Sequence, residues 1–155
     1  MIKENVYLKG ELEVIHYDVN KNIKSKEKYK NLIVNIGLET LAKMFNEIAS
    51  GGFKYLAIGT SDTEENSTQT ALISEITSPS GMARGLAECS YEADFKAVLE
   101  KIFTNNGESD ITIREAGIFN ASSDGQMFSR KVIPDKLLAP NESLLIIWKI
   151  IFQRG

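Results

Sequence analysis

The sequence is poor in the residue types that build covalent, metal-bound or reactive sites. Its 155 residues include one cysteine, Cys89, and one histidine, His16. A single cysteine excludes an internal disulfide framework and any cysteine-based zinc cluster, and it gives no support for an oxidising compartment. We therefore expect a protein that depends on its core for stability and folds in a reducing interior.

Long apolar runs and an excess of positive charge are also missing. No apolar run reaches the roughly 18–20 residues that span a bilayer, and no signal-type apolar stretch follows residues 1–5. The 18 Lys and Arg residues are outnumbered by 21 Asp and Glu residues, which gives a net charge of −3. This is the wrong sign for a surface that grips phosphates. We expect neither a membrane nor nucleic acid among the partners.

What the chain has is the composition of an ordinary globular domain, with 43% hydrophobic and 25% charged residues. Size scaling predicts that folding reduces an accessible surface of roughly 25,000 Å² to about 7,800 Å², so that about 69% is buried. No internal repeat or shift in composition divides the chain. We expect a single domain over residues 1–155, in which an N-terminal hairpin, residues 1–31, could project from a body formed by residues 32–155.

The expected hairpin joins residues 6–18 to residues 23–30 through the turn-forming residues 19–22. Because side chains alternate across a strand, its second strand presents four lysines on one face: Lys24, Lys26, Lys28 and Lys30. Lysines on an exposed edge commonly block edge-to-edge pairing. The functional alternative is a docking face for an acidic protein surface, and the sequence leaves both open.

One segment, residues 36–49, has helical spacing. Its apolar residues recur on one face: Leu38, Leu41, Ala42, Phe45 and Ile48. Asn35 precedes the segment as a candidate cap for the first-turn amides, and Gly51 and Gly52 follow it as a left-handed stop. We expect this to be the one α-helix of the protein, packed on the β-rich body.

The rest of the chain reads as strands and loops. The expected strands are residues 53–58, 83–91, 95–103, 111–120, 126–133 and 144–152. Residues 60–70 and the proline-containing residues 134–142 are expected as loops. The last strand carries Lys149 as its one charge and is expected at the centre of a sheet, covered on both faces. The sequence therefore predicts a mainly β protein, an antiparallel β-sandwich with one packed α-helix.

No motif for catalysis or cofactor binding emerges. His16 and Cys89 could in principle form a nucleophilic pair, but a lone histidine on a strand and a lone buried thiol are usually structural. The acidic residues 62–66 lack the spacing and glycine of a calcium loop. Gly59 and Thr60 are not followed by the lysine of a phosphate-binding loop. We expect no catalytic residues, no cofactor, no metal and no enzymatic activity.

A series of short segments is more specific in its order than any one of them alone. The segments are residues 35–38, 55–60 and 70–72, Glu75, Arg84, Arg114 with Glu-Ala-Gly-Ile-Phe-Asn at 115–120, Gly-Gln-Met-Phe-Ser-Arg at 125–130, and Ile-Trp-Lys-Ile at 147–150. This order resembles a group of small virion structural proteins of tailed bacteriophages, described as tail-fibre or capsid-decoration components. The resemblance covers roughly residues 35–152.

The resemblance implies a virion protein that is made in the cytoplasm of a host bacterium and binds phage capsid or tail proteins. By analogy it implies association of identical copies, as trimers. A compact domain without a coiled coil or repeat favours a capsid decoration protein, and a tail-fibre or baseplate adaptor with a host-recognition surface is the alternative. A carbohydrate-binding β-sandwich that uses Trp148 or Tyr91 as a sugar platform is the remote alternative.

Six residues of the resembling segments are expected to have structural roles: Arg84, Glu115, Gly117, Phe119, Arg130 and Trp148. We expect Arg84 to pair with Glu115 between neighbouring strands, and Gly117 to allow close backbone approach. Phe119 should face the opposite side of its strand from Ile118. Trp148 lies in an apolar strand, where burial is expected.

Overall fold

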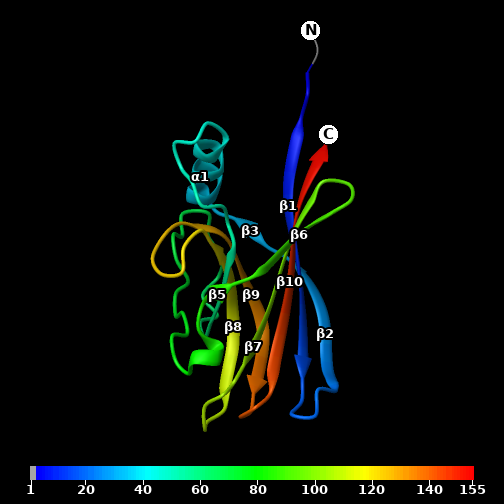
Figure 1. Ribbon diagram of the computed structural model, residues 1–155, viewed down its shortest axis with the longest axis vertical. Helices are drawn as coiled ribbons and strands as arrows, with labels where there is room; N and C mark the ends of the chain where they lie inside the picture. The colour runs from blue at the N-terminus through cyan, green and yellow to red at the C-terminus, as the bar shows by residue number, and fades with distance from the viewer. Residues whose placement is uncertain (1–2) are drawn as a thin grey trace.

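A computed structural model describes residues 3–155. Within this range, two five-stranded antiparallel sheets pack face to face (Figure 1). The first sheet has the strand order β2-β1-β10-β7-β6, and the second has the order β3-β9-β8-β4-β5. The predicted antiparallel β-sandwich is confirmed.

The elements follow one another with short connections. The first sheet contains, from edge to edge, β2 (Ile23–Lys30), β1 (Val6–Tyr17), β10 (Ser143–Arg154), β7 (Lys96–Thr104) and β6 (Glu88–Glu92). The second contains β3 (Leu32–Ile33), β9 (Met127–Leu138), β8 (Ile111–Phe119), β4 (Tyr55–Gly59) and β5 (Gly85–Leu86). The helix α1 (Asn35–Phe45) follows β3, and a short 3₁₀ helix, η1 (Ser80–Met82), precedes β5.

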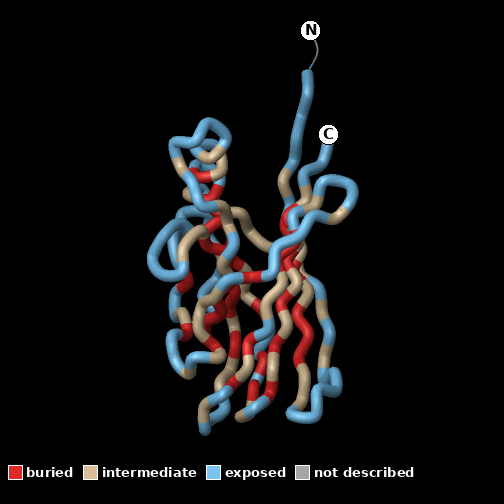
Figure 2. Tube along the Cα trace, viewed as in Figure 1, coloured by how far each residue is buried: buried red, intermediate tan, exposed pale blue. Residues whose placement is uncertain are grey.

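The core lies between the two sheets, where buried residues concentrate (Figure 2). The centrally placed β10 contributes alternate residues to it, with Trp148 fully buried. The indole nitrogen of Trp148 donates to Asn31 Oδ1 at 2.9 Å, so its polar atom is satisfied. The central position of this strand was predicted correctly. Its two faces differ, however, because the alternate residues, such as Ile147 and Lys149, are only half-buried on the outward face.

The N-terminal hairpin is part of the sandwich. β1 lies between β2 and β10, and it pairs with β10 along its whole length. The first residues of β1, up to Gly10, extend past the end of β2 and pair with residues 150–154. These two strand ends run together beyond the body in Figure 1. The paired parts of β1 and β2 therefore belong to the first sheet, and the part of the hairpin that extends beyond the body is the beginning of β1.

Two predicted boundaries between strands and loops were also wrong. Residues 83–91 do not form one strand, because the chain passes from β5 in the second sheet to β6 in the first. Residues 134–138 were expected in a loop but complete β9. Pro134 is accommodated there because the register with β8 shifts between Ile113 and Glu115, which leaves the proline opposite an irregularity in the ladder.

The helix is shorter than predicted and is capped differently. α1 ends at Phe45, before residue 49, and the left-handed residue just beyond it is Glu47 rather than Gly51. Asn35 does not cap the helix; its backbone N–H donates to the Ser67 carbonyl at 2.8 Å. Gly37 sets the contact with β9, since a Cβ at this position would lie 2.7 Å from the Cα of Phe128.

Candidate docking surfaces

The apolar face of α1 is largely uncovered, although the helix packs against β9. The helix buries Gly37 and Thr40, whereas Leu38 is 46% exposed and Phe45 is 95% exposed. Ile48, just beyond the helix, is 71% exposed. The helical spacing was recognised correctly, but the close approach at Gly37 turns a different face toward β9.

A groove runs between α1 and the C-terminal part of β10. It has a volume of about 650 Å³ and an almost entirely apolar lining: Leu38, Leu41, Ala42, Met44, Phe45 and Phe152. The helix and the upper end of the first sheet stand apart in Figure 1, with exposed segments on both (Figure 2). We call this the apolar groove. Contiguous apolar surface of this kind marks an interaction site in many proteins.

The alternating lysines of β2 are exposed as predicted, while Ser25, Glu27 and Tyr29 between them are half-buried. Their environments differ, however. Lys26 and Lys28 share one carboxylate, Glu13, at 3.5 and 3.7 Å. Surface pairs of this length contribute little. We refer to Lys26, Lys28 and Lys30 as the lysine edge.

Lys24, itself about half exposed, contacts a different cluster in which Glu142 and His16 are buried. Its Nζ lies 2.9 Å from Glu142 Oε2, while His16 Nε2 donates to Oε1 at 3.1 Å and the Ala139 N–H donates to Oε1 at 3.0 Å. Burial by itself would raise the pKa of Glu142, but these hydrogen bonds outweigh it and hold the pKa below its ordinary value. His16 therefore has a structural partner, and Cys89 lies three strands away on β6.

Replacing Glu142 with glutamine is expected to destabilise the protein at pH 7 by about 1–3 kcal/mol, because charge-assisted hydrogen bonds are lost. A carboxylate whose pKa is lowered by folding contributes stability above its unfolded pKa, and this contribution disappears as the pH falls through the folded pKa. The deficit of E142Q should therefore shrink below pH 4.5. Urea unfolding at pH 7 and pH 3 measures this; an equal deficit at both values would contradict it. E39Q, on the exposed side of α1, serves as the control.

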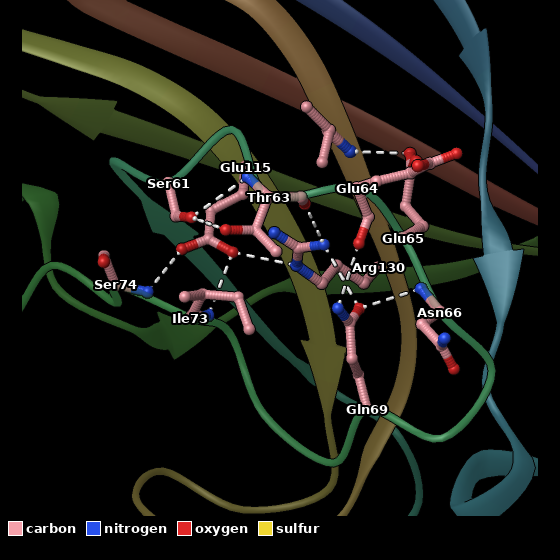
Figure 3. Close-up of polar contacts among 11 residues, drawn as sticks. Ser61, Thr63, Glu64, Glu65, Asn66, Gln69, Ile73, Ser74, Glu115 and Arg130 are labelled. Carbon is pink, nitrogen blue, oxygen red and sulfur yellow. Dashed lines mark hydrogen bonds and ion pairs between the residues drawn. The ribbon is translucent and has the colours of Figure 1, made fainter.

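A buried ion pair organises the outer face of the second sheet (Figure 3). Arg130 Nε donates to Glu115 Oε2 at 2.9 Å, and both side chains have no solvent exposure. The same carboxylate accepts the backbone N–H groups of Ile73 at 3.1 Å and Ser74 at 2.7 Å. Arg130 Nη1 donates to the Thr63 carbonyl at 2.7 Å. These bonds fasten the loop of residues 60–76 to β8 and β9.

Arg84 is not the partner of Glu115, so that prediction was wrong. Its Nε donates to Glu75 Oε2 at 3.0 Å, and its Nη1 donates to the carbonyls of Ala121 and Asp124. The guanidinium also lies 3.6 Å from the centre of the Phe119 ring. Because these donors are used within the chain, the role of Arg84 is structural: it joins Glu75 and the turn at residues 121–124 to Phe119 of β8.

The other residues of the resembling segments have structural positions. A Cβ on Gly117 would lie 2.9 Å from Leu72 Cδ2, so the glycine lets the loop approach the sheet closely. Ile118 belongs to the main core and Phe119 to a second core under the loop, which confirms that they face opposite sides. Complete burial excludes Trp148 as a sugar platform, whereas Tyr91 is 70% exposed on β6.

Comparisons with known proteins give no match: no protein-family model matches the sequence, and no curated protein matches it. Among residues 3–155, no group of three or more His, Cys, Asp or Glu side chains is placed to hold a metal ion. No helix in the same range has the length and apolar character to cross a membrane. A further hollow of about 660 Å³ lies beside Glu75, Arg84 and residues 122–126, where the guanidinium is already bonded within the chain. The apolar groove and the charged edges of the first sheet are the candidate docking surfaces.

Proposed function

We propose that the protein is a structural component of a tailed-bacteriophage virion, and specifically a capsid decoration protein that binds the assembled shell and identical copies of itself. The proposal begins with the short sequence segments whose order along the chain resembles that of such proteins. The observation that carries it is the apolar groove, which a single copy leaves uncovered, with Phe45 at 95% exposure. The protein is made in the host cytoplasm and functions in the particle.

A decoration protein has to be a stiff body with adhesive surfaces, since a lattice of many copies makes individually weak contacts sufficient. The buried and partly buried charged side chains on the outer face of the second sheet are paired within the chain, as the pairs Glu115–Arg130 and Glu75–Arg84 illustrate. The groove and the sheet edges are the surfaces left for partners. We assign the groove to the capsid shell protein.

The tail-adaptor alternative requires adaptable loops for host recognition, and the two segments expected as loops are residues 60–70 and 134–142. The first is fastened to the sheet through Arg130, whose Nη1 bonds Thr63 and Gln69. The second is partly strand β9. Both are poorly suited to adapt to a receptor, which favours decoration over the tail role.

The double variant F45S/I48S tests the assignment of the groove, because Phe45 lines it and Ile48 is an exposed apolar residue just beyond the end of the same helix. Both side chains are mostly exposed, so the melting temperature of the isolated protein should stay close to that of the wild type. Fluorescently labelled protein is added to particles that lack it, and bound label per head is counted. We expect at least a tenfold loss of binding, by analogy with the loss of a central apolar anchor.

The variant K43S provides the matched control, because Lys43 lies on the same helix and is exposed but polar. It should bind heads as the wild type does. Wild-type binding by F45S/I48S would show that the groove does not contact the shell, and failure of the wild-type protein to bind heads at all would contradict the proposed function.

A further inference from the structure

The two edges of the first sheet carry opposite charges on the same face. Among residues 3–155, β2 pairs only with β1 and β6 pairs only with β7, so each presents one row of backbone groups that is not paired with another strand of this range. The registers place Lys28 in one row with Glu13, Ile147, Glu100 and Glu88 across all five strands. The lysine edge and the glutamates of the other edge therefore project outward together.

Neither edge has its charge fully compensated within one copy. Glu88 is directly opposite Glu100, an arrangement of like charges that destabilises a strand pair. None of the ion pairs among residues 3–155 includes Glu88, Glu100 or Lys30. Lys28 is 75% exposed, with its one carboxylate at 3.7 Å. Opposite charges on a neighbouring copy would therefore stabilise each edge.

Symmetry decides which edges can meet. A two-fold contact would place β2 against β2 or β6 against β6, which opposes lysine to lysine or glutamate to glutamate. A head-to-tail contact places β2 of one copy beside β6 of the next and joins opposite charges. The alternating directions across β1, β10 and β7 leave β2 and β6 running the same way, so the new contact is a parallel strand pair that continues the sheet.

We propose that copies of this chain associate head to tail, with the lysine edge of β2 against Glu88 on the edge strand β6 of a second copy and Glu100 beside it on β7. The inference rests on the proposed function, because it assigns the contact between copies that a decoration protein needs. Head-to-tail contacts close into a ring when the rotation between copies permits it. The lysine edge thus has a partner of its own and leaves the apolar groove free for the shell.

A charge swap tests this contact in solution. The lysine-edge variant is K26E/K28E/K30E, which leaves Lys24 in place because it neutralises the buried Glu142. The glutamate-edge variant is E88K/E100K, and a third protein combines both sets. Sedimentation velocity at several protein concentrations and low salt should show association of the wild type. Each single-edge variant should self-associate about 100-fold more weakly, and the combined variant should recover.

Recovery of self-association in the combined variant distinguishes a specific contact between the two edges from an effect of net charge alone. An equimolar mixture of the two single-edge variants should also associate. One variant then has two negative edges and the other has two positive edges, so each attracts the other although it repels itself. The variant K21E/K43E/K54E changes three exposed lysines elsewhere and should associate as the wild type does. Circular dichroism melting of every variant checks that each one is folded.

Two outcomes would overturn the inference: a wild-type protein that stays monomeric, or folded single-edge variants that associate as the wild type does. In the first case the lysines serve only to block edge pairing. Neither outcome bears on the proposed function, which is tested separately by binding of the protein to heads.

Discussion

Replacing Arg130 with methionine is expected to lower the free energy of unfolding by about 3–5 kcal/mol, the range for breaking a buried ion pair from one side. Methionine fills much of the space of arginine but leaves the Glu115 carboxylate without a cation in a fully buried position. The bonds from Arg130 to Thr63 and Gln69 are lost as well. Urea unfolding at pH 7 measures the change in free energy.

The variant R114M is the matched control for R130M. Arg114 precedes Glu115 on β8 and also pairs with a carboxylate, but its partner Asp135 is 65% exposed. Its replacement should change the urea midpoint little, because exposed pairs contribute little. R130M should also make residues 60–76 more sensitive to limited proteolysis. Equal midpoints for R130M and R114M would show that the buried pair does not hold the loop.

The variant W148A should cost about 3–5 kcal/mol, as expected for truncating a large buried aromatic side chain. Trp148 has no solvent exposure and lies on the central strand β10. Its loss leaves a cavity between the sheets and removes the partner of Asn31 Oδ1. Circular dichroism is the readout, because the protein has no other tryptophan to report on unfolding.

The variant W148F separates the loss of core packing from the loss of the hydrogen bond to Asn31, since it keeps an aromatic ring and cannot donate to Asn31. It should be destabilised less than W148A. If W148A melted with the wild type, the indole would not be part of the core, and a sugar-binding role for this tryptophan would return.

The strands were predictable from sequence because alternation along a strand is a local property. Residues 6–18, 111–120 and 144–152 carry runs of branched and aromatic side chains, and they correspond to β1, β8 and β10. The chain passage from β5 to β6 was not predictable in this way. Both halves of residues 83–91 are extended, and only the packing of the sheets decides that they belong to different ones.

The candidate surfaces were only partly predictable. The alternation of lysines on β2 was enough to predict that they are exposed. The pairing of Lys24 with Glu142 was not predictable in this way, because the two residues are 118 positions apart. The apolar face of α1 was recognised, but its outward orientation depends on the close contact between Gly37 and Phe128. A glycine within a helix, facing a strand, is the signal that could have indicated which face turns inward.

The partner of Arg84 was mistaken because residues 60–76 have no periodic pattern that indicates where they return to the sheet. In the folded protein this loop lies over β8, and its backbone N–H groups and the guanidinium of Arg130 all donate to the Glu115 carboxylate. Arg84 then finds Glu75, which is close in sequence. Ion pairs between segments of unknown position cannot be assigned from residue types alone.

The proposed contacts divide the surface of the molecule between two kinds of partner. The groove is lined by residues of α1 and by Phe152 of β10. The lysine edge and the glutamate edge, which contains Glu88 and Glu100, lie on the two sides of the first sheet, whose outer strands are β2 and β6 (Figure 1). A copy can therefore bind its neighbours and the shell at the same time. Such simultaneous binding gives a lattice its avidity.

Immunogold labelling of the protein in purified virions tests the central claim most directly. If the protein decorates the capsid, gold should be distributed over the heads of particles recovered from cells that produce the protein. Gold confined to the tail tip would contradict the decoration role, and virions free of label would contradict a structural role in the particle altogether.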